Sequence, residues 1–185
     1  MNPIQLKKNK LRTDIANLKK ENTTKDLIFR SEEVLSILEI TGVFQEAKTI
    51  LIYNSLPDEV STLDFIDRWS QLKDFYLPVV TDNGLVFRKH SPSASFHQSA
   101  LGIYEPEGND FIDFKKVDIV IVPGVAFDRK MNRLGRGKGY YDRFLPKISA
   151  PKIGICFDFQ LLDQIPIEPT DIKMDYIIAE NELIW

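Results

Sequence analysis

The segment "RLGRGKGYYDRF", residues 133–144, combines residue types that suit the binding of a phosphate group. Its glycines at positions 135, 137 and 139 alternate with Arg136 and Lys138. Glycine adopts backbone angles that are closed to other residues, and a ligand can approach its main chain without meeting a Cβ atom. Backbone N–H groups can then converge on phosphate oxygens, and the two cations add charge-assisted hydrogen bonds. We therefore predict an anion site here; the alternative is a flexible loop with incidental charges.

The familiar nucleotide-binding motifs do not match this segment. Asn132 stands where a Walker A loop has its first glycine, no Ser or Thr follows Lys138, and Tyr140 breaks the spacing of a dinucleotide motif. Asp142 follows Gly139 by three residues, close enough for Mg²⁺ to bridge its carboxylate and a phosphate. It could equally pair with the positive end of a helix that begins at Tyr140. The residues alone leave both roles open.

Other charged residues are candidates with weaker signals. Asp171 and Asp175 form a second acidic pair in "TDIKMD", and their spacing does not decide whether either one completes a metal site or caps a turn. Lys8 and Arg12 are four residues apart and share a helix face, which on pattern alone indicates a solvated surface. Glu59 follows the first predicted strand, where an acid ahead of a helix is the ordinary interpretation.

The charge distribution favours a small anionic ligand. The 185-residue chain has a net charge of −3, yet residues 129–147 hold seven cations and one acid. A cationic focus on an acidic body suits a compact anion and argues against nucleic acid, because the surrounding field repels a long polyanion. The sequence begins without the apolar core of a signal peptide and has no stretch of membrane-spanning length. We expect a cytoplasmic monomer without a membrane partner.

Alternating helix and strand patterns predict how these residues are positioned. Apolar periodicity predicts helices over 4–21, 24–41 (ending at Gly42), 61–73 and 140–147, with a helical turn over 159–165. Apolar β-rich runs predict strands over 48–55, 75–80, 85–89, 117–122, 152–158 and, as the last one, 175–180.

These patterns predict an α/β fold: a three-layer α/β/α single domain over residues 1–185, with a mostly parallel central sheet. Ligands bind beyond the C-terminal ends of such strands. This rule selects the loop "NSLPDE" after the first strand and residues 123–139, which show no evident regular structure of their own.

The stretch "VPGVAFDRKMNRLGRGKGYYDRFL" closely resembles the signature of the 5-formyltetrahydrofolate cyclo-ligase family. The resemblance extends to "KNKLR", "YNSLPDE", "GIYEP" and "TDIKMD", and the family's single α/β/α domain agrees with the fold predicted above. It implies that ATP, with Mg²⁺ as cofactor, phosphorylates the formyl oxygen of 5-formyltetrahydrofolate. N10 then attacks the activated carbon, and phosphate leaves to give 5,10-methenyltetrahydrofolate and ADP.

The resemblance also implies roles for individual residues. ATP contacts fall on Lys8, Arg12 and the run Arg133, Leu134, Gly135, Arg136, Gly137, Lys138, Gly139, Tyr140 and Tyr141. Substrate contacts fall on Asn54, Glu59 and residues 136–140, which therefore face both substrates. Catalysis is implied for Lys138, Arg136 and Tyr140, and Mg²⁺ binding for Asp142 and Asp171. These implications reverse the ordinary interpretation of Lys8, Arg12 and Glu59.

Two positions depart from the family pattern. Met131 stands where the family commonly has glycine, and Asn132 next to it is a residue that tolerates a left-handed conformation. Leu101 replaces a tryptophan near "GIYEP". Because of these departures, an enzyme that uses the same segment on another substrate remains an alternative, as does a module that binds folate or nucleotide without turnover.

Overall fold

A seven-stranded sheet forms the centre of the computed structural model, which describes residues 2–91, 96–98 and 104–185. The strand order is β12-β11-β9-β6-β1-β2-β3, and the five inner strands are parallel. The edge strands β3 and β12 are antiparallel to their neighbours. The strands are β1 Thr49–Leu51, β2 Asp74–Thr81, β3 Gly84–Lys89, β6 Ile119–Val122, β9 Lys152–Ile155, β11 Tyr176–Ile178 and β12 Leu183–Ile184. The mostly parallel sheet is confirmed.

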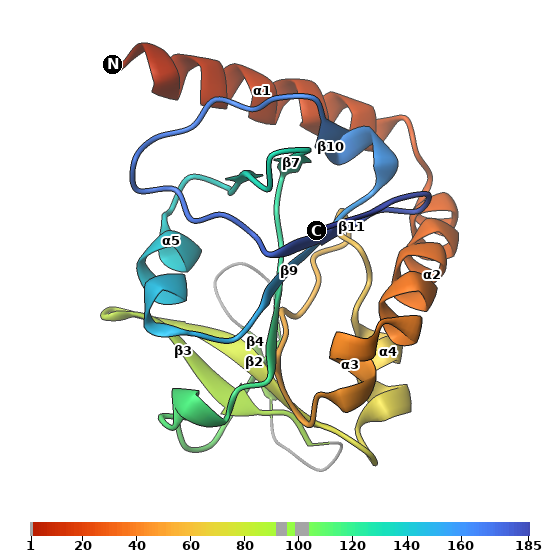
Figure 1. Cartoon of the computed structure of the whole chain (residues 1–185), viewed down its shortest axis with the longest axis vertical. Helices are drawn as coiled ribbons and strands as arrows, with labels where there is room; N and C mark the ends of the chain where they lie inside the picture. The colour runs from red at the N-terminus through yellow and green to blue at the C-terminus, as the bar shows by residue number, and fades with distance from the viewer. Residues whose placement is uncertain (1, 92–95, 99–103) are drawn as a thin grey trace.

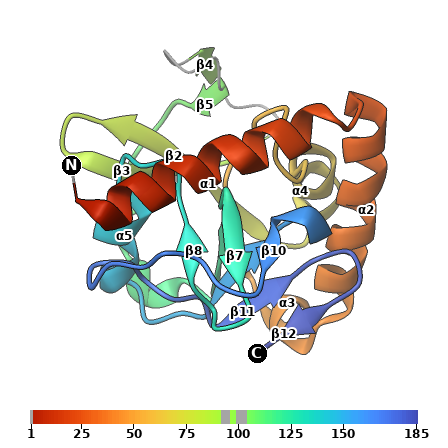
Figure 2. The same cartoon turned by 90° about the horizontal axis from the view of Figure 1, so that it is seen from above.

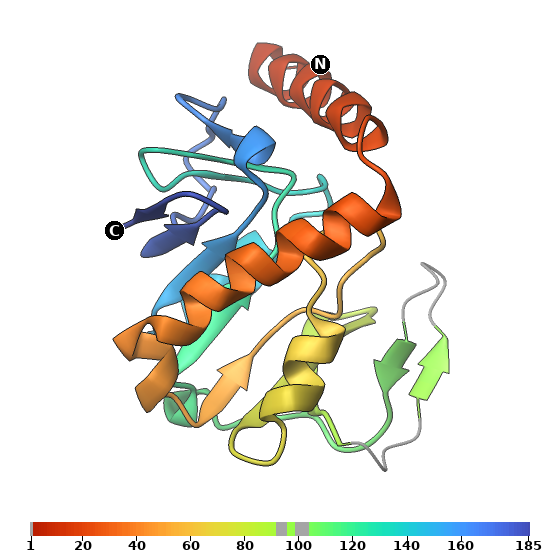
Figure 3. The same ribbon diagram turned by 90° about the vertical axis from the view of Figure 1, so that its right-hand side faces the viewer.

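Apolar side chains project from both faces of this sheet, so each face needs a covering layer. Ile50 and Ile52 pack in one core with α2 (Thr24–Ile40), α3 (Gly42–Glu46) and α4 (Leu63–Trp69). Leu51 points to the opposite face, into a core with α5 (Tyr140–Phe144) and the following 3-10 turn η2 (Leu145–Lys147). Figures 1 and 3 show the two layers on either side of the strands. The predicted three-layer arrangement is confirmed.

A second, three-stranded sheet corrects one prediction. Within residues 123–139, β7 (Ala126–Asp128) and β8 (Arg133–Leu134) form an antiparallel hairpin, and β10 (Leu161–Leu162) pairs with β7. The expectation of no regular structure there was wrong, because strands of two or three residues are too short to give an apolar period. They nevertheless bury Ala126 and Leu134.

Helix α1 (Pro3–Lys20) covers this small sheet and not a face of the large one (Figure 2). Its Ile15 packs with Val125, Ala126 and Leu134, which lie beyond the C-terminal end of β6. The helix is polar on its outer side, and within residues 2–91, 96–98 and 104–185 no helix combines the length and apolarity that a bilayer crossing requires. The contact places α1 beside the glycine segment.

The ends of α2 show one confirmed and one wrong prediction. A capping box at its start joins the Thr23 side chain to the Asp26 N–H and the Asp26 carboxylate to the Thr23 N–H. The expected stop at Gly42 was wrong: α2 ends at Ile40, Thr41 has an extended backbone and is also the N-cap of α3, and Gly42 begins that next helix.

The remaining elements are short. They are β4 (Phe96–Gln98), which pairs with β5 (Tyr104–Pro106), and the 3-10 turns η1 (Phe114–Lys116) and η3 (Asp158–Gln160). The run 175–180 was expected to be the last strand, but β12 follows it, because a tight turn returns the chain beside β11.

Candidate active site

The glycine segment lies between two cavities at the C-terminal ends of the parallel strands. We call one the apolar cavity; its apolar lining is Tyr53, Leu56, Pro78, Val80, Leu85, Tyr140 and Tyr141. We call the other the ionic cavity, with the charged lining Lys8, Arg12, Asp142, Arg143, Glu168 and Asp171. Their volumes, open mouths included, are about 920 and 1110 Å³. Gly135, Gly139 and Asp142 line both cavities, so this shared wall separates one cavity from the other.

In the ionic cavity, Lys8 is buried among carboxylates. Its Nζ lies 2.6 and 2.8 Å from the two oxygens of Asp171 and 3.0 Å from Glu168. The Glu168 N–H also donates to Asp171 at 2.7 Å. An uncompensated buried ammonium would be costly, and this cluster compensates it. The structure therefore brings together two residues 163 positions apart in the chain.

Arg12, one helical turn after Lys8, reaches the glycine segment itself. Its Nε donates to the Gly135 carbonyl at 2.8 Å, and its guanidinium lies beside Gly137. Burial lowers the pKa of Arg12, and the charges of Asp171 and Glu168 act in the opposite direction. The guanidinium stays charged, because arginine is not deprotonated in proteins. Helix α1 thus supplies two cations to the ionic cavity.

Arg133 supports the wall between the cavities. It is buried, and its Nη2 donates to Asp142 Oδ1 at 2.8 Å across the start of α5. Its Nη1 lies 3.3 Å from the Pro123 carbonyl, and its guanidinium lies over the Tyr141 ring. A Cβ at Gly135 would stand 2.8 Å from that same Nη1, so glycine is the residue that fits. The Arg133–Asp142 pair fixes the carboxylate at the wall.

Arg136 joins three elements around the mouth of the apolar cavity. Its guanidinium contacts Glu59 at 3.0 and 3.1 Å and Asp58 at 2.7 Å. Asp58 in turn accepts from Lys19 of α1 at 2.9 Å. Burial acts to raise the pKa of Asp58, but the charges of Lys19 and Arg136 outweigh it and the pKa is lowered. Lys19 lies three turns after Lys8 on α1, and this spacing could have marked Lys19 as a further residue of the site. Nothing in the sequence singles out Asp58.

Lys138 and Tyr141 offer polar groups to the apolar cavity. The Lys138 side chain is exposed at its edge and forms no ion pair with any residue that the structure describes. The Tyr141 hydroxyl is buried and has no hydrogen-bond partner among the described residues. Burial, with Glu59 adding to it, raises the pKa of Tyr141, so this hydroxyl is a neutral donor. Both groups are placed to meet a ligand.

The backbone of the glycine segment uses the freedom that its composition suggested. Gly137 has a φ of +97° and Gly139 a φ of +67°, both left-handed. Arg143 Nη1 donates to the Lys138 carbonyl at 3.0 Å, and its guanidinium lies over Tyr140. These contacts fix the end of the segment against α5. A side chain at Gly137 or Gly139 would strain this turn.

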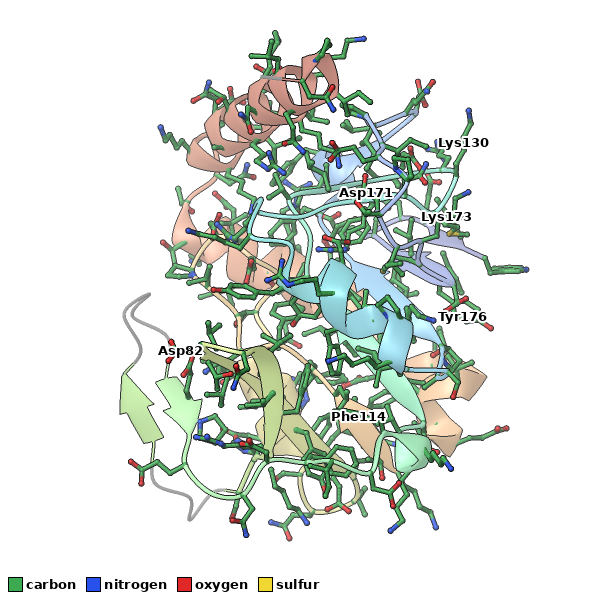
Figure 4. The ribbon with its side chains drawn as sticks, turned by 90° about the vertical axis from the view of Figure 1, so that its left-hand side faces the viewer. Asp82, Phe114, Lys130, Asp171, Lys173 and Tyr176 are labelled. Atoms are coloured by element: carbon green, nitrogen blue, oxygen red, sulfur yellow. The ribbon has the colours of Figure 1, made fainter. Side chains whose placement is uncertain are left out.

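The carboxylates that could hold a metal lie on the ionic side. Asp142 and Asp171 line the same cavity (Figure 4 labels Asp171), whereas Asp175 bonds to Lys152 on β9. Among the described residues, no group of three or more His, Cys, Asp or Glu side chains could hold a metal ion. Two carboxylates suit Mg²⁺ that is shared with phosphate oxygens, since Mg²⁺ takes few protein ligands. Asp171 would then have to share its oxygens with Lys8.

The other sequence candidates are placed as follows. Asn54 is buried and lines the apolar cavity with Glu59. Leu134 lines the ionic cavity. Met131 has a φ of +67°, so the left-handed residue of the turn is Met131 itself and not Asn132. We expected the tolerance of Asn132 for a left-handed conformation to preserve this turn, but Asn132 does not adopt that conformation. Leu101 lies outside the described residues.

An apolar and an ionic cavity that share one wall, at the C-terminal ends of a parallel sheet, mark an α/β enzyme with adjacent sites for two small ligands. The model of the 5-formyltetrahydrofolate cyclo-ligase family matches residues 4–180. The chain belongs to this family, as the signature resemblance implied.

Relatives with that activity cover nearly the whole chain. The 5-formyltetrahydrofolate cyclo-ligase of Haemophilus influenzae is 33% identical over 183 residues, which are 94% of this chain and 97% of that protein. The solution structure of 5,10-methenyltetrahydrofolate synthetase from Aquifex aeolicus matches with a TM-score of 0.86 at 32% identity, covering 96% and 91% of the two chains. A synthetase structure from Mycoplasma pneumoniae matches with a TM-score of 0.74 at 27% identity, covering 92% and 97%.

Proposed function

We propose that this enzyme converts 5-formyltetrahydrofolate to 5,10-methenyltetrahydrofolate at the expense of Mg-ATP. The observation that carries the proposal is the shared glycine wall: the apolar cavity offers apolar surface to the faces of a pterin ring and polar side chains to its edge, and the ionic cavity suits a triphosphate. A phosphoryl group needs to move only across Gly135, Gly139 and Asp142. The family match and the relatives named above support the choice of substrate.

The proposed reaction has two steps. The formyl oxygen attacks the γ-phosphorus of ATP, the bond from that phosphorus to the β–γ bridging oxygen breaks, and ADP leaves. N10 then attacks the formyl carbon, the carbon–oxygen bond to phosphate breaks, and N10 releases its proton. Phosphorylation is needed because an unmodified formamide oxygen is a poor leaving group. The protein's task is positioning and charge stabilisation.

The residues divide this task between the two cavities. In our proposal Lys8, Arg12 and the backbone of residues 133–141 bind ATP, and Asn54, Glu59 and Tyr140 bind folate. In our proposal Lys138 contacts the transferring phosphoryl group. Its ammonium is available for this contact because it lines the apolar cavity and has no ion pair among the described residues. Arg136 contributes from the mouth of the apolar cavity, where Glu59 and Asp58 orient it.

The carboxylates present fit a magnesium ion that is shared with phosphates. Asp142 and Asp171 would hold it, and when bound Mg²⁺ neutralises phosphate charge. The Arg133 guanidinium already orients the Asp142 carboxylate at the wall, so the protein fixes the position of one of the two carboxylates. Lys8 would exchange part of its contact with Asp171 for phosphate oxygens.

The proposal is tested by incubating pure protein with Mg-ATP and 5-formyltetrahydrofolate. Methenyltetrahydrofolate absorbance should develop, with one ADP formed for each methenyl product. ADP release with another metabolite, but not with this folate, would instead favour an enzyme of different specificity. The Met131 departure does not support that alternative, because Met131 keeps the left-handed backbone that glycine commonly provides in the family.

A further inference from the structure

Lys19 is a buried cation near the end of α1 that the function proposed above does not use. Only 7% of it is exposed. Its Nζ donates to Asp58 Oδ2 at 2.9 Å, and the other oxygen of that carboxylate, Oδ1, accepts from Arg136 Nη2 at 2.7 Å. The Asp58 carboxylate therefore bridges α1 and the glycine segment, with one cation on each of its oxygens.

The two ends of this bridge differ in how firmly they are held. Lys19 lies on an 18-residue helix, and Ile15, one turn earlier, packs in the core with Leu134. The side chains of Asp58 and Arg136, by contrast, are 43% and 47% exposed. An exposed ion pair contributes little by itself, because ordering two long side chains costs entropy and solvent screens their charges. Of the three side chains in the bridge, Lys19 is therefore the one that the core holds in place.

Glu59 completes a balanced cluster of charges at the mouth of the apolar cavity. Its Oε1 accepts from Arg136 Nε at 3.1 Å and from Nη2 at 3.0 Å, so two cations and two carboxylates meet there. These contacts do not use Nη1, which can bind a phosphoryl oxygen while the other two nitrogens are held. Without Lys19, the two carboxylates would share one guanidinium.

The bridge also ties Arg136 to the helix that lines the ionic cavity. Helix α1 runs across β8 and β7 (Figure 2), and its Lys8 and Arg12 line that cavity. Lys19 follows Lys8 by eleven residues, which is about 16 Å along the helix axis. One rigid element therefore places the cations of the ionic cavity and, through Asp58, the guanidinium at the mouth of the apolar cavity.

We propose that Lys19 is a positioning residue, which acts through Asp58 to hold the Arg136 guanidinium in place for the transferring phosphoryl group. This inference rests on the proposed function, because it gives Arg136 a part in that transfer. A guanidinium that is held in advance stabilises developing charge without having to reorganise during the reaction. Misplacing such a group by about 1 Å can lower a rate by on the order of 10²-fold, so a partial loss of order should already lower kcat.

The first test is kinetic. Lys19→Met keeps a long apolar side chain in the buried position and removes the charge. We expect kcat to fall about 10-fold and the KM for Mg-ATP to stay within about twofold, because the bridge serves the transition state and not the binding of nucleotide. Lys20→Met is the matched control: Lys20 is the exposed neighbour on the same helix, and its loss should leave both constants at the wild-type values.

Double variants separate the positioning of Arg136 from a change of charge. Asp58→Asn and the double variant Lys19→Met/Asp58→Asn should each lose about as much kcat as Lys19→Met, because all three break the same bridge. In an Arg136→Ala background, Lys19→Met should lower kcat by no more than about twofold. Recovery of wild-type kcat in the charge-balanced double variant, or an undiminished loss in the Arg136→Ala background, would overturn the inference. The double variant buries no unpaired ammonium, so it still decides if Asp58→Asn does not fold.

A measurement without substrates separates this inference from the proposed function. The Arg136 Nε–H is hydrogen-bonded to Glu59, and NMR can follow its exchange with water once Arg136→Lys has assigned its signal. Exchange should be at least about fivefold faster in Lys19→Met and unchanged in Lys20→Met. Unchanged exchange in Lys19→Met would overturn the inference. Wild-type protein that forms no methenyl product from Mg-ATP and 5-formyltetrahydrofolate would instead refute the proposed function, whatever the exchange rates are.

Discussion

The ionic and apolar cavities differ in how their charges are compensated. In the ionic cavity each charged side chain already has a partner: Lys8 has Asp171 and Glu168, and Asp142 has Arg133. In the apolar cavity, the Lys138 ammonium and the Tyr141 hydroxyl lack partners within the described part of the chain. Paired charges keep an empty site stable, whereas uncommitted groups are available to a ligand.

This difference implies two modes of binding. A triphosphate must exchange partners with existing ion pairs, so its affinity depends on how far Lys8 and Arg12 prefer phosphate to their present contacts. A folate enters a cavity in which the Lys138 ammonium and the Tyr141 hydroxyl are already available to it. Preformed sites lose less free energy to ordering. We therefore expect mutations on the ionic side to change the use of nucleotide selectively.

The largest effect is expected for Lys138→Ala, which removes the uncommitted cation from the wall. We expect kcat/KM to fall about 10²- to 10³-fold, as when one stabilising donor is lost from a transition state. The melting temperature should change by no more than about 2 °C, because the side chain is exposed. Steady-state kinetics and thermal unfolding measure the two effects.

Lys130→Ala is the matched control for that variant. Lys130 is exposed in the β7–β8 turn and projects outward in Figure 4. It should retain wild-type kinetics. If Lys138→Ala lowered the melting temperature markedly as well as the turnover, Lys138 would serve the fold. The contrast between the cavities would then lose its main support.

The sequence indicated the unusual backbone of the glycine segment because local chemistry determines it. Alternate glycines are needed where φ is positive or a side chain would meet Arg133, and these requirements lie within one short segment. The inner strands were predictable for a similar reason. A strand such as β6, buried on both faces, is a continuous apolar run, so its pattern needs no knowledge of its neighbours.

Contacts between distant segments could not be predicted in the same way. The pairing of Lys8 with Asp171 spans 163 residues, and spacing along a chain says nothing about proximity at that separation. For Lys8 the helical pattern favoured solvent, but the return of the chain over α1 buries it. The β7–β8 hairpin was missed because its stability comes from packing beneath α1, not from its own period.

A smaller and more selective effect is expected for Asp171→Asn. Loss of one carboxylate should raise the KM for Mg-ATP about 10- to 100-fold, a range typical of weakened metal sites. The KM for 5-formyltetrahydrofolate should stay within about twofold, because Asp171 lines the ionic cavity and not the apolar one. Kinetics at varied magnesium concentration would measure the shift.

Asp175→Asn provides the comparison that the sequence left open. Asp175 accepts from the Lys152 N–H at 2.8 Å and lies outside the lining of the ionic cavity. It should leave the KM for Mg-ATP close to the wild-type value. Nucleotide defects of equal size in the two variants would contradict the assignment of Asp171 and would mean that the whole 168–175 loop responds as a unit.

The smallest effect concerns Met131, in the turn between β7 and β8. Its φ of +67° costs a residue with a Cβ about 1–2 kcal/mol, and its carbonyl accepts from the Met174 N–H at 2.8 Å. Replacement by Ala or Gly removes the same packing, so comparing the two isolates the backbone. Met131→Gly should be more stable than Met131→Ala by about 0.5–1 kcal/mol, after the entropy cost of glycine. Urea unfolding measures this difference.

In an ordinary backbone conformation the order of stability would reverse, so a less stable Met131→Gly would show that the turn is not left-handed at residue 131. Since Met131 lines neither cavity, both variants should retain wild-type KM values for the two substrates.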